Sequence, residues 1–140
     1  MTEVEPTPGI DLSNAFLRAL IVVAIFAIVG PPVGGLIAWL GMGAASLQSP
    51  LPFILGSYAE GLLFAAGAGV YVAASWWLFG KTSFIAPIVG AILANLVFHG
   101  ATMTAVPDPD TVSRLAYVFL PGSIVAALTC WFIAKRLFPR

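Results

Sequence analysis

Apolar residues in this chain form four long runs that lack the alternation of β-strands. The runs cover residues 16–41, 53–79, 84–106 and 115–137. The hydrocarbon core of a bilayer is about 30 Å thick, so a helix needs roughly 20 apolar residues to cross it. Runs of this length are far too long for the strands of a membrane barrel. The pattern therefore predicts an all-α, polytopic transmembrane four-helix bundle.

The first run contains a proline pair that has to be accommodated inside a helix. Cutting the run at Pro31-Pro32 would leave a first piece too short to span the bilayer. A proline removes one backbone hydrogen bond and clashes with the preceding turn. Membrane helices tolerate this because neighbouring helices can satisfy the freed carbonyls. We therefore expect a single first helix that is kinked at Pro31-Pro32.

The segments between the runs are short and rich in turn-forming residues. Prolines punctuate residues 48–52 and 107–110, and a Gly-Lys-Thr turn covers residues 80–82. Residues 1–14 are acidic and contain two prolines, which predicts a flexible tail. Residues 15–140 then form one transmembrane domain, and no connecting segment is long enough to hide a soluble domain.

The basic residues orient the predicted bundle. Five of the six fall on one side of a four-span topology, and cytoplasmic loops of membrane proteins carry the excess of lysine and arginine. Both termini are therefore expected in the cytoplasm. The N-terminal residues do not resemble a transit peptide, and this favours the bacterial inner (plasma) membrane. The five are Arg18, Lys81, Lys135, Arg136 and Arg140, and Arg114 is the exception.

Composition supports the membrane assignment and removes some partners. Hydrophobic residues make up 60% of the 140 residues and charged residues only 9%, whereas a soluble domain carries about 25% charged residues. Membrane lipid is thus the expected surrounding. The net charge is zero and no basic patch occurs, so nucleic acid is not an expected partner.

Small residues recur at every fourth position of the second run, which places them on one helix face. Such faces let helix backbones approach closely in a membrane. Two interpretations are open: the face packs inside the bundle, or it docks another transmembrane subunit or a second copy. The residues are Ser57, Gly61, Ala65, Gly69 and Ala73.

Two ionisable residues, Glu60 and His99, lie inside predicted spans, where such groups are costly and mark functional candidates. At 1.5 Å per residue, both lie about 10 Å below the outer boundary. Asn95 shares the His99 face, and Arg114 begins the fourth span. The functional hypothesis is a proton- or cation-responsive site. Alternatively, Glu60 pairs with His99 or Arg114 only to hold the bundle together, or it reaches to the interface.

Other chemistries find no support in the sequence. No cluster of histidine, cysteine and carboxylate residues has the spacing of metal ligands, and no hydrolase motif or phosphate-binding loop is present. We therefore expect that the protein binds no metal or cofactor and is not an enzyme. A lone His99 binds a haem only if a partner supplies the second ligand. The first hypothesis is a non-catalytic accessory or assembly subunit of a larger inner-membrane complex. The alternative is a homo-oligomeric transporter or channel that uses Glu60 and His99.

Overall fold

The computed structural model describes residues 12–43, 49–80, 83–102, 117 and 119–138. Within these ranges the chain is helical and no strand occurs, which confirms the predicted all-α class. The elements are α1 (Leu12–Ala38), a π-helical turn η1 (Trp39–Gly43), α2 (Leu51–Phe79), α3 (Ile85–Thr102) and α5 (Leu120–Leu137).

Three segments are long and apolar enough to cross a membrane. They are Ser13–Gly41, Leu51–Phe79 and Leu120–Leu137, and they correspond to the first, second and fourth predicted spans. The apolar part of α3, Ile85–Val97, is shorter. The third predicted span continues to residue 106, and its last four residues lie outside the described ranges. The structure thus confirms three candidate spans, and the fourth crossing stays a prediction.

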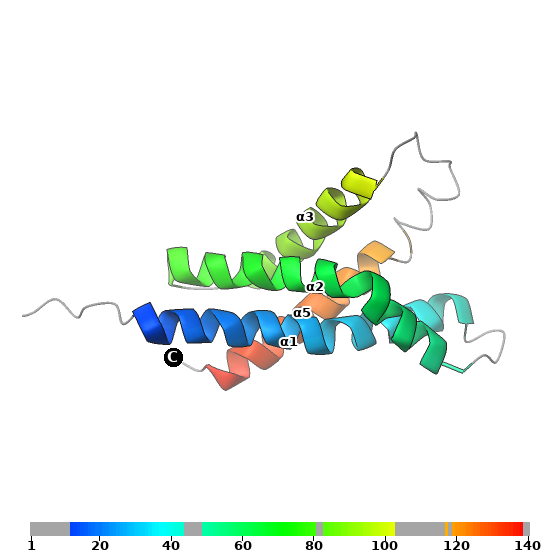
Figure 1. Cartoon of the computed structure of the whole chain (residues 1–140), viewed down its shortest axis with the longest axis horizontal. Coiled ribbons are helices and arrows are strands. Elements are labelled where there is room, and N and C mark those ends of the chain that lie inside the picture. Colours follow the sequence, from blue (N-terminus) through cyan, green and yellow to red (C-terminus); the bar gives the residue numbers. More distant parts are fainter. Residues whose placement is uncertain (1–11, 44–48, 81–82, 103–116, 118, 139–140) are drawn as a thin grey trace, which may run out of the picture.

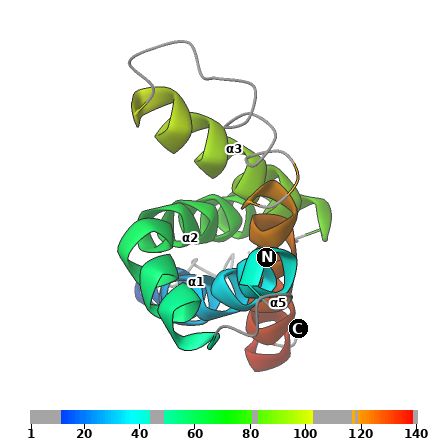
Figure 2. The same ribbon diagram turned by 90° about the vertical axis from the view of Figure 1, so that its right-hand side faces the viewer.

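Helices α1 and α2 lie side by side and antiparallel over most of their lengths (Figure 1). Helix α5 crosses this pair and packs mainly on α1, while α3 packs on α2 and α5 and then diverges from the bundle (Figures 1 and 2). The start of α1, the end of α2 and the end of α5 lie at the same end of the bundle (Figure 1). Arg18 near the start of α1 and Lys135 and Arg136 in the last turn of α5 lie there, so this end is called the basic end below.

Helix α1 continues through its proline pair. Because Pro32 has no amide hydrogen, the carbonyl of Ile28 loses its intrahelical donor. The hydroxyl of Tyr58 on α2 donates to that carbonyl at 2.6 Å. A neighbouring helix therefore satisfies a freed backbone group, as the sequence led us to expect. The kink itself stays a prediction.

Glycines allow α1 and α2 to pack at very short separation. The surface along which these two helices touch, at Gly35 and Gly69, is called the α1–α2 seam below. A Cβ added to Gly35 would lie 2.8 Å from the carbonyl oxygen of Phe53. One added to Gly69 would lie 2.9 Å from the Cβ of Phe26. Real Cβ atoms are essentially never this close to such neighbours, so the two backbones meet where only a glycine fits.

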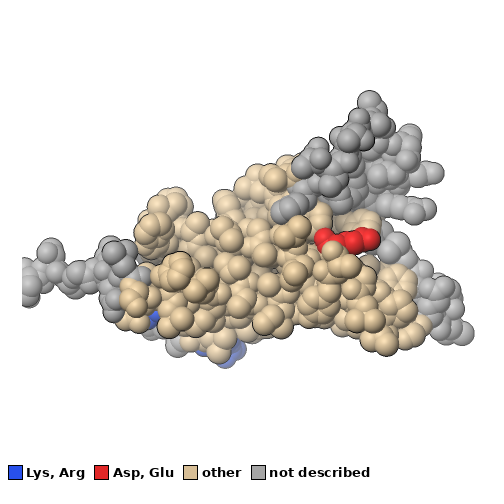
Figure 3. Space-filling view, viewed as in Figure 1, with Lys and Arg blue, Asp and Glu red and all other residues tan. Residues whose placement is uncertain are grey.

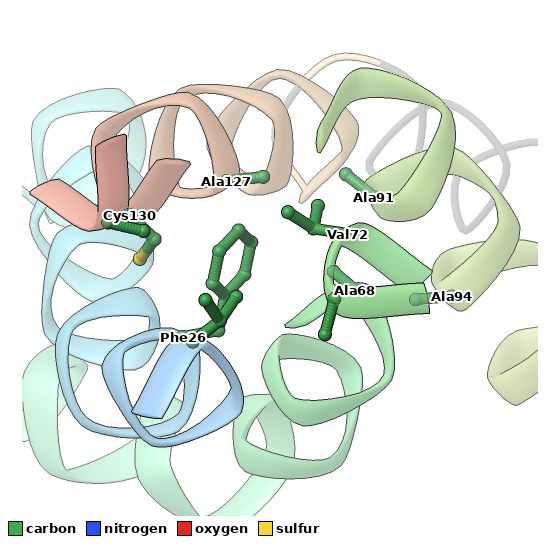
Figure 4. Packing of buried hydrophobic residues seen from close by; sticks show 10 residues of the cluster. Phe26, Ala68, Val72, Ala91, Ala94, Ala127 and Cys130 are labelled. Atoms are coloured by element: carbon green, nitrogen blue, oxygen red, sulfur yellow. The ribbon is translucent and has the colours of Figure 1, made fainter. Parts of the chain in front are cut away.

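The core lies where all four described α-helices meet, and it is built around Phe26 of α1 (Figure 4). This ring is 1% exposed, and its neighbours are mostly small side chains, which let the helices close around one large group. Val22 and Val72 are buried with it. The other members of this cluster that Figure 4 labels are Ala68, Ala91, Ala94, Ala127 and Cys130.

Candidate functional site

A cavity of about 370 Å³ lies between the described helices, beyond the core and away from the basic end. It is called the central hollow below. Its walls come from the second half of α1, the first half of α2, the middle of α3 and the first half of α5. Residues that are distant in the sequence, such as Gly34, Gly61, Asn95 and Ser123, therefore face the same space.

The central hollow exists because its walls are made of small residues and because α3 diverges from the other helices (Figure 2). A Cβ added to Gly34, Gly56 or Gly61 would meet nothing within 4 Å. Gly30 and Gly35, which also line the hollow, bring α1 into close contact with α2, but these three glycines leave space. Most of the lining is apolar, and its largest side chains are four phenylalanines: Phe26, Phe53, Phe64 and Phe119.

Three of the polar side chains in the lining donate to backbone carbonyls. The hydroxyl of Ser57 lies 2.7 Å from the carbonyl of Pro31 on α1 and equally far from that of Ile54. The Nδ2 of Asn95 and the hydroxyl of Ser123 each donate to a carbonyl one turn earlier, at 2.8 Å. The donor atoms of these side chains are therefore satisfied within the protein, and their oxygen atoms can still accept hydrogen bonds from the hollow.

Glu60 is the charged residue among the described lining residues. It is the tenth residue of α2, which places it about 13 Å along the helix from Leu51. An ionised carboxylate at such a depth is costly unless something compensates its charge. The described cations lie at the basic end, whereas the acidic side chain lies toward the other end of the molecule (Figure 3). None of the described cations is therefore placed to neutralise Glu60.

The structure brings together two of the four predicted polar site residues. Glu60 and Asn95 line the same hollow. Arg114 and the side chain of His99 lie outside the described residues, so their part in the site stays a prediction. Sequence reasoning missed Ser123 and the wall glycine Gly56. Serine on an apolar helix gives no signal of its own, because its hydroxyl can bond the preceding turn.

The small-residue face of α2 lies largely against α1. Ser57 and Ala65 contact the α1 backbone region around Pro31 and Gly30, and Gly69 contacts Phe26. Ala73 is buried. Gly61 differs, because it faces the central hollow. Packing within the chain thus occupies most of this face.

The chemistry of the central hollow suits an apolar body that carries a positive charge. Phenyl rings present negative faces that attract cations, and a carboxylate attracts them more strongly. In the described part of the chain no group of three or more potential metal ligands occurs, so the described residues do not form a metal centre.

No protein-family model, no curated protein and no solved structure matches this chain.

Proposed function

We propose that this chain is a small integral protein of the bacterial inner membrane that crosses the bilayer four times, with cytoplasmic termini. Three candidate spans support the membrane assignment. The shared end of α1, α2 and α5 carries the described cations, which agrees with the charge bias of cytoplasmic ends (Figures 1 and 3). The fourth crossing would be made by α3 and the residues that follow it.

The function that we propose is binding and transport of a small amphipathic cation by a homo-oligomer. The observation that carries it is a 370 Å³ hollow whose lining contains a carboxylate, Glu60, that none of the described cations neutralises. Ligand pockets typically measure about 300–1,000 Å³ and are apolar with a few well-placed polar groups. The central hollow has both properties.

The same volume argues against the accessory-subunit role that the sequence alone placed first. An α-helix with its side chains is about 10–12 Å across, so a partner helix would need far more than 370 Å³ to cross the bundle here. The small-residue face of α2, which had supported docking, is occupied largely by α1. The accessory role therefore becomes the second proposal.

Transport would require more than one static copy. The central hollow occupies one half of the bundle, and Phe26, Val22 and Val72 are fully buried beside it toward the basic end. This packed core closes the route through the described part of a single chain. A path would form between copies, or by movement of α3, which is the helix that diverges from the others (Figure 2).

Binding of tetraphenylphosphonium to the purified full chain in a neutral detergent tests the proposal. Tetraphenylborate has the same shape and the opposite charge, so it serves as the matched probe. We expect saturable binding of the phosphonium ion, little binding of the borate ion, and a loss of about tenfold or more in affinity for Glu60→Gln, because a charge-assisted contact disappears. Glu5→Gln, the same chemical change in the predicted N-terminal tail, should bind like the wild type.

Equal binding of the two probes, or equal affinity of Glu60→Gln and the wild type, would overturn the proposal. Reconstituted vesicles then test transport, and we expect uptake of the phosphonium ion that is lost in Glu60→Gln. A stoichiometric second protein in the purified sample, together with a wild-type-like Glu60→Gln, would instead place the accessory role first.

A further inference from the structure

A second cavity, of about 440 Å³, lies at the basic end between the start of α1 and the end of α2. It is called the basic hollow below. Arg18 of α1 forms one side and the neighbouring tryptophans Trp76 and Trp77 of α2 form the other. It shares none of its lining residues with the central hollow.

Aromatic stacking fixes the position of Arg18. Its guanidinium lies 5.9 Å from the centre of the Phe138 ring, a cation–π distance. Phe138 in turn meets Trp76 edge to face, with ring centres 6.2 Å apart. This chain of contacts joins α1, α2 and the end of α5, and it presents a planar cation beside the hollow. A guanidinium held in this way loses less conformational freedom when it binds an anion.

The depth of the basic hollow corresponds to the lipid headgroups. Arg18 is the seventh residue of α1, and Trp76 and Trp77 belong to the last turn of α2, which ends at Phe79. Tryptophans concentrate at the membrane–water interface. Deeper in the membrane the flanking surface is apolar, since Leu20 of α1 is 50% exposed and Val70 of α2 is 55% exposed, and both present hydrocarbon to lipid chains.

The sign of the charge in this region is set by side chains. The start of α1 contributes a partial positive charge of about one half and the end of α2 a partial negative charge of similar size, so these two helix ends roughly cancel. The end of α5 adds a second partial negative charge, which Lys135 and Arg136 in its last turn outweigh. The full charge of Arg18 remains. Lys135 and Arg136 lie at the same end, on the rings of Trp131 and Phe132, and the described acid, Glu60, lies far from them (Figure 3).

We propose that the basic hollow binds the phosphate of an anionic phospholipid headgroup, with Arg18 as the principal donor. The five guanidinium N–H groups match phosphate oxygens in paired geometry. The two tryptophans flank the glycerol region, and the acyl chains lie along the apolar surface of α1. This site is independent of the function proposed for Glu60.

Native mass spectrometry of the full chain in neutral detergent tests the proposal. The protein is titrated with dioleoyl phosphatidylglycerol and, separately, with dioleoyl phosphatidylcholine. We expect a single molecule of the phosphatidylglycerol to bind about tenfold more tightly than the phosphatidylcholine. Arg18→Gln should abolish that preference. Arg136→Gln removes the same charge at the same end, outside the hollow, and should change the affinity by less than about twofold.

Ala15→Glu provides a second variant in case Arg18→Gln does not fold. Ala15 lines the basic hollow, so a carboxylate there should repel the phosphate and abolish the preference while Arg18 is kept. Equal affinity for the two lipids in the wild type would overturn the proposal. The proposal would also be overturned if Arg18→Gln and Arg136→Gln lost equal affinity for the anionic lipid, or if Ala15→Glu kept the preference for that lipid. Displacement of the lipid by millimolar inorganic phosphate would overturn it as well.

Discussion

The glycines that bring α1 and α2 into contact and the glycines that leave the central hollow open differ in what surrounds them, although they belong to the same two helices. Gly34 and Gly35 are adjacent on α1. A Cβ on Gly35 would collide with the backbone of α2, whereas one on Gly34 would meet nothing within 4 Å. Gly69 and Gly61 on α2 show the same contrast. Small residues at helical spacing therefore have two opposite effects: some let the helix backbones approach closely, and others leave a space between the helices.

The largest effect that this contrast predicts is for Gly35→Ala. The new Cβ would lie 2.8 Å from the Phe53 carbonyl and 2.9 Å from the Ile54 Cα, and backbone atoms cannot move aside cheaply. We expect the free energy of unfolding to fall by about 2–3 kcal/mol, as for overpacked cores. Circular dichroism in mixed micelles of mild detergent and dodecyl sulfate would measure it. Gly34→Ala is the matched control, and equal losses in both variants would remove the distinction.

Tyr58→Phe should have the next largest effect. The substitution removes the donor to the Ile28 carbonyl, which Pro32 leaves without an intrahelical partner. An unsatisfied carbonyl in an apolar setting costs about 1–2 kcal/mol, which is the loss expected in the same unfolding measurement. Combining Tyr58→Phe with Pro32→Ala restores the backbone donor, so the double variant should lose less than the single one. A double variant as unstable as Tyr58→Phe would contradict this account.

Ser57→Ala should cost less, although Ser57 also bonds across the seam. Its hydroxyl has a single proton and two carbonyl acceptors, those of Pro31 and Ile54. Both acceptors also lie within helices that can supply backbone donors. We therefore expect a loss of about 0.5 kcal/mol, typical of side-chain hydrogen bonds between membrane helices. A loss as large as that of Tyr58→Phe would mean that the missing backbone donor to the Ile28 carbonyl does not distinguish the two hydrogen bonds.

Gly61→Leu should leave stability nearly unchanged, by less than about 0.5 kcal/mol, because its side chain enters the central hollow. The same variant should lose tetraphenylphosphonium binding, since leucine occupies ligand space. Gly69→Leu, two turns along α2, provides the contrast and should not fold. A stable Gly61→Leu that binds like the wild type would show that the ligand lies elsewhere.

Much of the fold follows from the sequence, because the bilayer demands long apolar runs and prolines mark the connections. The spans ending at Gly41 and Phe79 agree closely with the structure. The sequence could not say which helix faces meet, since these helices are apolar on all sides and spacing alone does not distinguish Gly61 from Gly69. It did single out Glu60, because a carboxylate in a span is conspicuous. The hollow beside Glu60 depends on the divergence of α3, which no local pattern encodes.

The contact between Arg18 and Phe138 brings the beginning of the first helix close to the end of the last. Two copies could therefore be joined head to tail by a short covalent tether without either bundle being reversed in the membrane. Such a concatemer would let one Glu60 be altered at a time, so that the number of carboxylates needed per functional unit could be counted. The same closeness would make duplication and fusion of the gene a short evolutionary step.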